Sequence, residues 1–300
     1  MVDPLTEVVA LLQPSASFSK TVSCVGGWRV RRVEAGRPFY CVVLGGSACL
    51  TIPGREPMPL HDGDFVLVPS AYDFAMSSLE PPPDDIENIP VEIGRGEFRL
   101  GPADLTPDVR LLVGYCEFGS PDAAMLVSLL PQIVHVRGES RLATLVGLVA
   151  DEARDERLGR EVILARLLEV LLIEAFRSSE TAAVSQGLVR GLADRHIAVA
   201  LRRMHETPTR PWTVAQLAKE AALSRSAFFD RFNRTVGLAP MEYLLAWRMA
   251  LAKGRLRRNE GSITEVAEYV GYSSASAFSV AFARHVGMPP ARYGRQQASI

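Results

Sequence analysis

The sequence has few of the residues that build metal centres, and it has no long apolar run. Five histidines occur in 300 residues and only His61 and His135 precede residue 190, so spacing assembles no cluster of three ligands. No segment approaches the roughly 18 apolar residues of a membrane span. Acids at Asp3 and Glu7, without a basic flank, do not fit a secretory signal. We therefore expect a soluble cytoplasmic protein with no metal and no other cofactor.

Cysteine is also scarce, and its spacing argues against a disulfide framework or a zinc site. The four cysteines, Cys24, Cys41, Cys49 and Cys116, form no Cys-x-x-Cys pair. Three of them lie in apolar, strand-like runs, which indicates reduced thiols in a protein core, with redox sensing as the alternative. The sequence also has no nucleophile elbow, no phosphate-binding loop and no paired-carboxylate motif, which argues against the common classes of hydrolase and nucleotide-binding enzyme.

Charge is divided unevenly along the chain. The whole sequence has 33 Lys and Arg against 34 Asp and Glu, a net charge of −1. Residues 186–300 hold 17 basic and 8 acidic residues, about +9, which leaves 16 and 26, about −10, for residues 1–185. A basic segment of this kind is the electrostatic footprint of a DNA-binding domain.

The basic segment contains one helical pattern twice. Four apolar residues with helical spacing recur 49 residues later: Val214, Leu217, Ala218 and Ala221 match Ile263, Val266, Ala267 and Val270. Five more recur at an offset of 50: Phe228, Phe232, Gly237, Pro240 and Tyr243 match Phe278, Phe282, Gly287, Pro290 and Tyr293. An internal repeat of this length indicates one supersecondary unit used twice.

Each copy has the pattern of a helix-turn-helix, the first at about residues 213–237 and the second at about 262–287. Capping boxes begin both copies, Thr213 with Gln216 and Ser262 with Glu265. The following helix buries two phenylalanines and leaves its other face free, as a recognition helix does in a major groove. A plain helical bundle with duplicated halves is the alternative, and the positive charge favours DNA binding.

These residues resemble the DNA-binding domain of the AraC/XylS family of transcription regulators. The resemblance rests mainly on the run from Ile263 to Ala267, on Gly271-Tyr272, and on the later Phe, Gly, Pro and Tyr positions of the second copy. It implies a long helix at about 241–258 that sets both recognition helices into successive major-groove segments, and RNA polymerase as a partner. Asp230 and Val280 depart from the family pattern, because arginine is usual midway along each recognition helix.

The residues expected to contact DNA flank the buried phenylalanines on the opposite helix face. They are Arg225, Ser226, Phe229, Asp230, Arg231, Arg234, Ser274, Ala275, Ser276, Ser279, Val280 and Arg284. Guanidinium groups on the first helix read guanine well, whereas serine, alanine and valine on the second discriminate weakly between bases. The sequence therefore predicts an asymmetric DNA site.

Short β-strands separated by Gly and Pro dominate the N-terminal part. The expected strands are Trp28–Val33, Phe39–Leu44, Ser47–Ile52, Phe65–Val68 and Leu111–Phe118. Gly45-Gly46 between two of them predicts a tight hairpin. Many short strands with close turns are typical of a sandwich or a barrel.

The run Leu60–Pro69 is similar to a cupin signature, and Gly114–Phe118 and His135–Gly138 resemble the cupin-like sensor domain of one AraC branch. We therefore expect an all-β cupin-like barrel within residues 1–138. Its mouth could bind a small-molecule effector, or side chains could simply fill it. The lining residues proposed from strand alternation are Val30, Phe39, Val42, Leu44, Leu50, Phe65 and Leu67.

Two amphipathic helices, Arg141–Arg157 and Glu161–Phe176, occupy the connecting segment 139–185. In the family such helices often form a homodimer, and packing against their own barrel is the alternative. Ser178–Gln186 reads as a linker. Residues 186–300 then form the DNA-binding domain, whose first helix is expected over Leu188–Thr207.

The predicted fold class is multidomain α+β, an all-β cupin-like barrel followed by connecting helices and an all-α domain with two helix-turn-helix units. The predicted function is sequence-specific DNA binding by a transcription regulator that responds to a small molecule. It is not an enzyme, and its partners are double-stranded DNA and an effector, with no membrane. A cupin-type enzyme with an accessory DNA-binding domain and a protein-interaction module are the alternatives.

Overall fold

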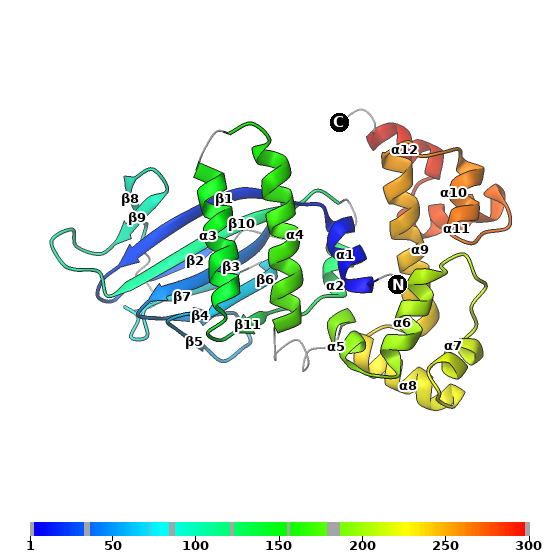
Figure 1. Cartoon of the computed structure of the whole chain (residues 1–300), viewed down its shortest axis with the longest axis horizontal. Helices are drawn as coiled ribbons and strands as arrows, with labels where there is room; N and C mark the ends of the chain where they lie inside the picture. Colours follow the sequence, from blue (N-terminus) through cyan, green and yellow to red (C-terminus); the bar gives the residue numbers. More distant parts are fainter. Residues whose placement is uncertain are drawn as a thin grey trace. The chain divides into compact units, whose positions relative to one another are not determined.

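The chain divides into two units in the computed structural model, which describes residues 3–32, 37–71, 73–83, 88–120, 123–154, 157–178 and 187–297. One unit, the sensor unit, comprises residues 12–185. The other, the helical unit, combines residues 186–300 with the first eleven residues. Figure 1 labels the elements of both units. None of the described helices is long and apolar enough to cross a membrane.

Two β-sheets build the sensor unit. The larger has the strand order β11 (Val134–Val136), β6 (Phe65–Ala71), β3 (Arg37–Gly45), β10 (Val109–Phe118), β1 (Pro14–Cys24), β9 (Glu97–Leu100) and β8 (Val91–Gly94). The smaller has the order β2 (Arg29–Arg32), β7 (Phe74–Ser77), β4 (Ser47–Thr51) and β5 (Met58–His61). Neighbouring strands pair antiparallel, except that β1 and β9 run parallel.

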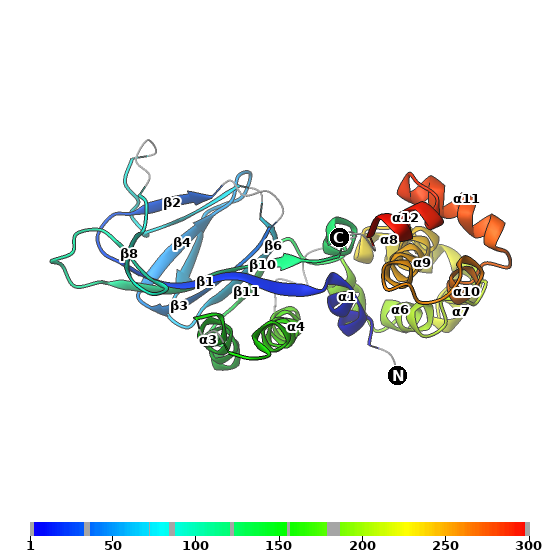
Figure 2. The ribbon, with the colours of Figure 1, turned by 90° about the horizontal axis from the view of Figure 1, so that it is seen from above.

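The two sheets lie face to face, and two helices cover the outer side of the larger one (Figure 2). Strand alternation on β3 turns Phe39, Cys41 and Val43 toward the core between the sheets. The helices α3 (Ser140–Arg154) and α4 (Arg160–Ser178) contact β1 on the other side. Within the described residues, the strands of each sheet pair only with one another. The cupin-like unit is therefore a β-sandwich, one of the two architectures that the strand pattern indicated, and its sheets do not close into the barrel expected from the cupin resemblance.

Gly45-Gly46 does not form the predicted hairpin, because the strands on either side of it belong to different sheets. β3 pairs with β6 and β10, whereas β4 pairs with β5 and β7. Gly46 has a φ of 81°, and a Cβ at this position would overlap the carbonyl oxygen of Asp108. Glycine is needed here because the chain crosses from one sheet to the other against a neighbouring backbone.

The helical unit contains the duplicated motif. Its helices are α5 (Leu188–Ala193), α6 (Ile197–Glu206), α7 (Val214–Glu220), α8 (Arg225–Val236), α9 (Pro240–Arg257), α10 (Ile263–Tyr269), α11 (Ala275–Val286) and α12 (Pro290–Gln297). The single helix predicted over Leu188–Thr207 is interrupted at Asp194, whose Oδ1 accepts hydrogen bonds from the backbone N–H groups of His196 and Ile197. A side chain that caps the following turn in this way ends one helix and begins the next.

Residues 1–138 were all assigned to the cupin-like domain, but helix α1 (Pro4–Leu12) lies largely in the helical unit. The Glu7 carboxylate lies 2.6 Å from Nδ1 of His205, and Nε2 of that ring lies 2.7 Å from the Tyr243 hydroxyl. Burial is the largest influence on His205 and lowers its pKa, and the ring stacks on Trp247 at 4.0 Å between centroids. A neutral ring satisfies both partners when Nδ1–H donates to Glu7 and Nε2 accepts from Tyr243.

The turns of the two motifs share one backbone conformation but not one residue type. Ala222 has a φ of 51° and the equivalent Gly271 a φ of 83°. The same hydrogen bonds close both turns, since Leu223 donates to the Ala218 carbonyl and Tyr272 to that of Ala267, each at 2.9 Å. The first motif therefore places a Cβ in the left-handed region, where glycine is free of strain.

Exchanging the two residue types should change stability in opposite directions. We expect Ala222→Gly to raise the free energy of unfolding by about 0.5 to 1 kcal/mol, the relieved strain less the added entropy of glycine in the unfolded chain. Gly271→Ala should lower it by about 2 kcal/mol or more, because the new Cβ would lie 2.7 Å from the Thr209 carbonyl oxygen and 2.9 Å from the Arg248 guanidinium. Chemical denaturation measures both, and equal stability of the two variants would disprove the strain argument.

Candidate functional site

An aromatic triad holds each recognition helix in the same way. In the first motif the Phe228 and Phe232 rings lie 5.6 Å apart between centroids, and Phe232 meets Tyr243 edge-on at 5.9 Å. In the second the corresponding distances, for Phe278, Phe282 and Tyr293, are 5.4 and 5.6 Å, with the same edge-on angle of 72°. The four phenylalanines are fully buried, as predicted. The repeat therefore fixes which face of α8 and of α11 is turned inward.

Side-chain caps set where these helices begin. Both predicted capping boxes, Thr213 with Gln216 and Ser262 with Glu265, are confirmed. Ser224 and Ser274 accept from the backbone N–H groups three residues later at the starts of α8 and α11. Each motif is thus closed at two helix starts by its own local sequence.

Most of the residues predicted to contact DNA lie exposed on the outer faces of α8 and α11. On α8 these are Arg225, Ser226, Phe229, Asp230 and Arg234, and at α11 they are Ser274, Ser276, Val280 and Arg284. Phe229 is 40% exposed and Val280 70% exposed, although both are apolar. Apolar side chains of this kind are suited to contact with thymine methyl groups.

Three of the predicted contact residues have a different place. Nε of Arg231 donates to Oδ2 of Asp194 at 2.7 Å, so this guanidinium ties α8 to the turn between α5 and α6. The Ser279 hydroxyl donates to the Ala275 carbonyl within its own helix at 2.7 Å, and both residues are half-buried. Arg231 therefore forms an ion pair within the protein. Ser279 and Ala275 have little hydrogen-bonding capacity to offer to a DNA base.

Sequence reasoning missed other residues of these faces. Ala227 and Ala277 are exposed and were not among the predicted contacts. Helical spacing could have found them, because Ala227 lies three residues before Asp230 and Ala277 three before Val280. No sequence signal marks Arg248 of α9, which donates to the carbonyls of Pro208 and Arg210 at 2.7 and 2.8 Å. It fastens the loop before the first motif to the helix that joins the two motifs.

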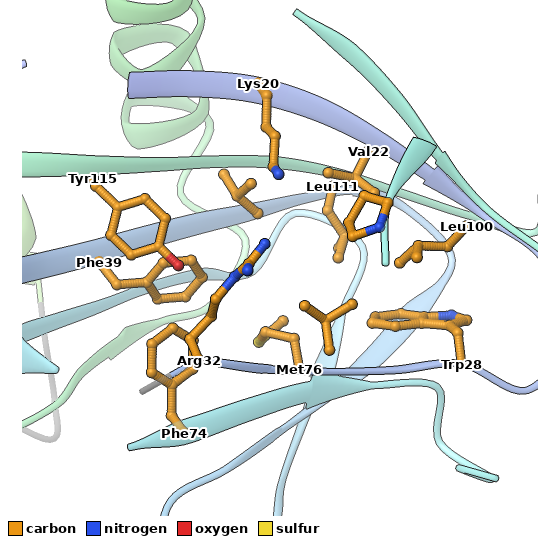
Figure 3. A pocket seen from close by; sticks show the side chains of 13 residues that line it. Lys20, Val22, Trp28, Arg32, Phe39, Phe74, Met76, Leu100, Leu111 and Tyr115 are labelled. Atoms are coloured by element: carbon orange, nitrogen blue, oxygen red, sulfur yellow. The ribbon is translucent and has the colours of Figure 1, made fainter. Parts of the chain in front are cut away.

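The sensor unit contains a cavity of about 50 Å³ between its two sheets (Figure 3). Its aromatic lining consists of Trp28, Phe39, Phe74 and Tyr115. Its aliphatic lining includes Val22, Val30, Met76, Leu100, Leu111 and Val113. Lys20 from β1 and Arg32 from β2 point into it from opposite sides. The space holds only about three to five water molecules, so it suits a compact ligand.

The residues proposed for the effector pocket divide between this cavity and other places. Val30 and Phe39 line it, and Leu50 belongs to the same core. Val42, Phe65 and Leu67 are buried but lie outside that core, because their inward-facing neighbours are Cys41, Val43, Val66 and Val68. Leu44 is 39% exposed. The prediction was wrong because it combined residues from both faces of β3 and took the residues of β6 that point away from the core between the sheets.

A second hollow, of about 430 Å³, lies beside α2 (Ala123–Ser128). Three of its polar side chains are already paired. The Arg55 guanidinium donates to the Gln132 side-chain oxygen, and Asp73 accepts two hydrogen bonds from Arg31. Despite its larger volume, this hollow presents fewer unsatisfied groups to a ligand than the cavity between the sheets.

The two N-terminal histidines, His61 and His135, both form hydrogen bonds with the Asp64 carboxylate. His135 Nε2 lies 3.0 Å from Oδ2 of Asp64, which also accepts from the backbone N–H of His61. Within the described ranges, no three His, Cys, Asp or Glu residues lie close enough to hold a metal ion. Burial raises the pKa of Cys24 and Cys116 to about 12, and that of Cys41 rises as well, so these three thiols stay protonated and unreactive.

Known proteins share both halves of this architecture. A family model described as cupin matches residues 3–179, and one described as a helix-turn-helix domain matches residues 217–296. An AraC-like transcription regulator of Streptomyces lividans is 36% identical over 303 residues, which covers 97% of each protein. The chain belongs to the family of AraC-like transcription regulators.

A second relative also matches nearly the whole chain. An AraC-like regulator of Streptomyces antibioticus is 34% identical over 300 residues, covering 97% of this chain and 98% of that protein. The solved DNA-binding domain of AdpA in complex with a target DNA is 30% identical, with a TM-score of 0.34, and covers 35% of this chain and 95% of that domain. The two full-length relatives and the two family models show that this AraC-like chain is a DNA-binding transcription regulator with a cupin N-terminal domain.

Two exposed positions are those at which the resemblance to the AraC/XylS family predicts arginine. Asp230 and Val280 stand midway along α8 and α11, where arginine is expected. A carboxylate can accept from a cytosine amino group and repels phosphates, whereas valine can touch only a methyl group. The base preference of this regulator should therefore differ at both positions from that of relatives with arginine.

Proposed function

We propose that this regulator reads a long, asymmetric DNA site through the outer faces of α8 and α11, and that a small molecule in the sensor cavity controls this binding. The duplicated aromatic triad carries the first half of the proposal. It turns the same face of both helices inward, so that Arg225, Ser226, Phe229, Asp230 and Arg234 of α8 are left outside together. The positive charge of residues 186–300 supplies attraction to phosphates.

Chain connectivity supports control by the sensor. Helix α1 ends at Leu12 and strand β1 begins at Pro14, with only Gln13 between them. β1 carries Lys20 and Val22 to the cavity, while Glu7 of α1 holds His205 of the helical unit. A ligand that shifts β1 would therefore pull on a helix attached to the DNA-binding half.

Homodimer formation, an RNA polymerase contact and a cytoplasmic location belong to the same proposal. Val162 and Ile163 on α4 and Leu148 on α3 are apolar yet 67%, 44% and 48% exposed, and a second copy of the chain would bury such side chains. RNA polymerase and the cytoplasm follow from the family resemblance. Sedimentation of the purified chain as a monomer at micromolar concentration would count against the dimer.

We infer a regulator and not an enzyme. Three buried thiols stay protonated, and the rings of His135 and His61 lie within hydrogen-bond distance of Asp64 and Ser47. Both full-length relatives described above are named transcription regulators. The cupin-type enzyme would need a metal, and elemental analysis of the purified protein separates the two functions.

DNA selection with the full chain tests the proposal directly. We expect it to bind a defined sequence, and Arg225→Ala combined with Arg234→Ala to weaken that binding at least tenfold, because each arginine can contact a phosphate or a guanine. The log–log salt slope should fall by roughly one to two units. Arg110→Ala on the sensor unit removes the same type of charge and should change neither. Failure to select any sequence, or wild-type affinity of the double variant, would refute the DNA-reading assignment.

A further inference from the structure

Two side chains that line the cavity between the sheets carry buried donors without acceptors within the described ranges. Lys20 is only 8% exposed, and its ammonium contacts the faces of Phe98 and Phe18, at 4.4 and 5.3 Å from the ring centroids. Trp28 is 1% exposed, and its indole N–H has no hydrogen-bond partner among the described residues. An unmatched buried donor is costly, and a buried ammonium without a carboxylate more so.

A second cation increases that cost. Arg32 enters the cavity from β2 and faces Lys20 from the opposite sheet (Figure 3). No carboxylate within the described part of the chain forms an ion pair with either group. Burial, and secondarily the charge of Arg32, lower the pKa of Lys20. Two cations therefore converge on an apolar space that has no anion of its own.

We propose that this cavity binds a compact monocarboxylate, with the carboxylate between Lys20 and Arg32 and a short apolar body against Trp28, Met76 and Leu111. This inference rests on the proposed function of the cavity as the effector site and names the class of effector. One negative charge with two acceptor oxygens matches an ammonium and a guanidinium fork, and the charge-assisted bonds form where water is excluded. A neutral compound of the same shape would leave both cations unpaired.

The shape of the cavity selects against other anions. Its walls are almost wholly aliphatic and aromatic, so a fully hydrated inorganic phosphate would lose water without gaining partners for its remaining oxygens. Its small volume favours a short carbon chain. Butyrate is therefore the probe of choice, with butyramide as its neutral counterpart and inorganic phosphate as the anion without an apolar body.

The stability of the ligand-free protein distinguishes a binding residue from a structural one. Lys20→Met keeps the aliphatic stem and removes the buried charge, so the melting temperature should rise while anion binding is lost. Binding sites commonly trade stability for function in this way. Arg31→Met on the adjacent position of β2 is the matched control, because Arg31 pairs with Asp73 instead of entering the cavity.

Calorimetric titration of the full chain with butyrate tests the proposal. We expect saturable binding of butyrate, binding at least tenfold weaker in both Lys20→Met and Arg32→Met, and no change in Arg31→Met. Butyramide and phosphate should not bind measurably. Equal binding of butyramide, undiminished butyrate binding by both cavity variants, no binding of butyrate by the wild type, or a lower melting temperature for Lys20→Met would overturn the assignment. Because no DNA is present, these results stand apart from the DNA-selection experiment.

Discussion

Replacing Phe232 with alanine is expected to lower the free energy of unfolding by about 3 to 5 kcal/mol, the usual loss for a buried aromatic ring. Phe232 is fully buried and touches both other members of its triad, Phe228 and Tyr243. Loss of the ring leaves a hole at the centre of the first motif, so α8 loses the inner face that orients it. DNA affinity should fall with stability, because a helix that is not held rigidly pays for its ordering on binding.

Phe229 provides a matched control on the same helix. It lies three residues before Phe232 and is 40% exposed. Phe229→Ala should change the free energy of unfolding by less than about 1 kcal/mol, as surface substitutions do, while weakening DNA binding at positions where a thymine methyl is preferred. Denaturant unfolding followed by tryptophan fluorescence is suitable, since Trp212 and Trp247 are both buried in the helical unit. An equal loss of stability in both variants would show that Phe229 is part of the core.

The helical unit could be predicted well from the sequence because its signals are local and occur twice. The capping boxes, the buried phenylalanine pairs and the long helix now seen at Pro240–Arg257 all depend on residues within a few turns of one another. The repeat also removes ambiguity, because a residue pattern that occurs in both copies is rarely accidental. The interruption at Asp194 was missed, since a capping side chain within an apolar helical pattern has no periodic signature.

The sensor unit was predicted less well because its structure depends on distant pairing. Strand β1 was missed entirely, since Pro14–Cys24 is rich in serine and has only two β-branched residues, Thr21 and Val22, yet it is held between β10 and β9. The prediction of a Gly45-Gly46 hairpin was wrong because two residues cannot indicate whether the strands on either side belong to the same sheet. The cavity could not be assembled from sequence, since its two cations come from separate strands in different sheets.

The contact between Glu7 and His205 shows the same limit most clearly. The two residues are separated by 198 positions, and neither has a sequence pattern that points to the other. No local pattern therefore indicated that the first eleven residues belong to the helical unit. The predicted linker Ser178–Gln186 lies outside the described residues, apart from Ser178 at the end of α4.

The DNA motif of this regulator is expected to be sharp under the first helix-turn-helix unit and loose under the second. On α8, Arg225, Asn233 and Arg234 are exposed and offer hydrogen-bonding groups that match guanine and adenine edges, and Asp230 matches cytosine. On α11, the serine side chains that could contact bases discriminate weakly, and two of their hydroxyl groups are already hydrogen-bonded within the protein. The Ser274 hydroxyl accepts from the Ala277 N–H at 3.1 Å, and that of Ser279 donates to its own helix.

A single bidentate contact is worth about 1 to 3 kcal/mol against the wrong base, which a lone serine such as Ser276 does not match. Arg225→Ala should therefore remove most discrimination at one position under α8, about 5- to 150-fold against the wrong base, whereas Ser276→Ala should leave the motif nearly unchanged. Asp230→Arg should alter the preferred bases in the same half of the site only. Binding measured across a randomised operator gives all three results. Equal or greater sequence information under α11, or an unchanged motif in Arg225→Ala, would show that α8 is not the more discriminating of the two helices.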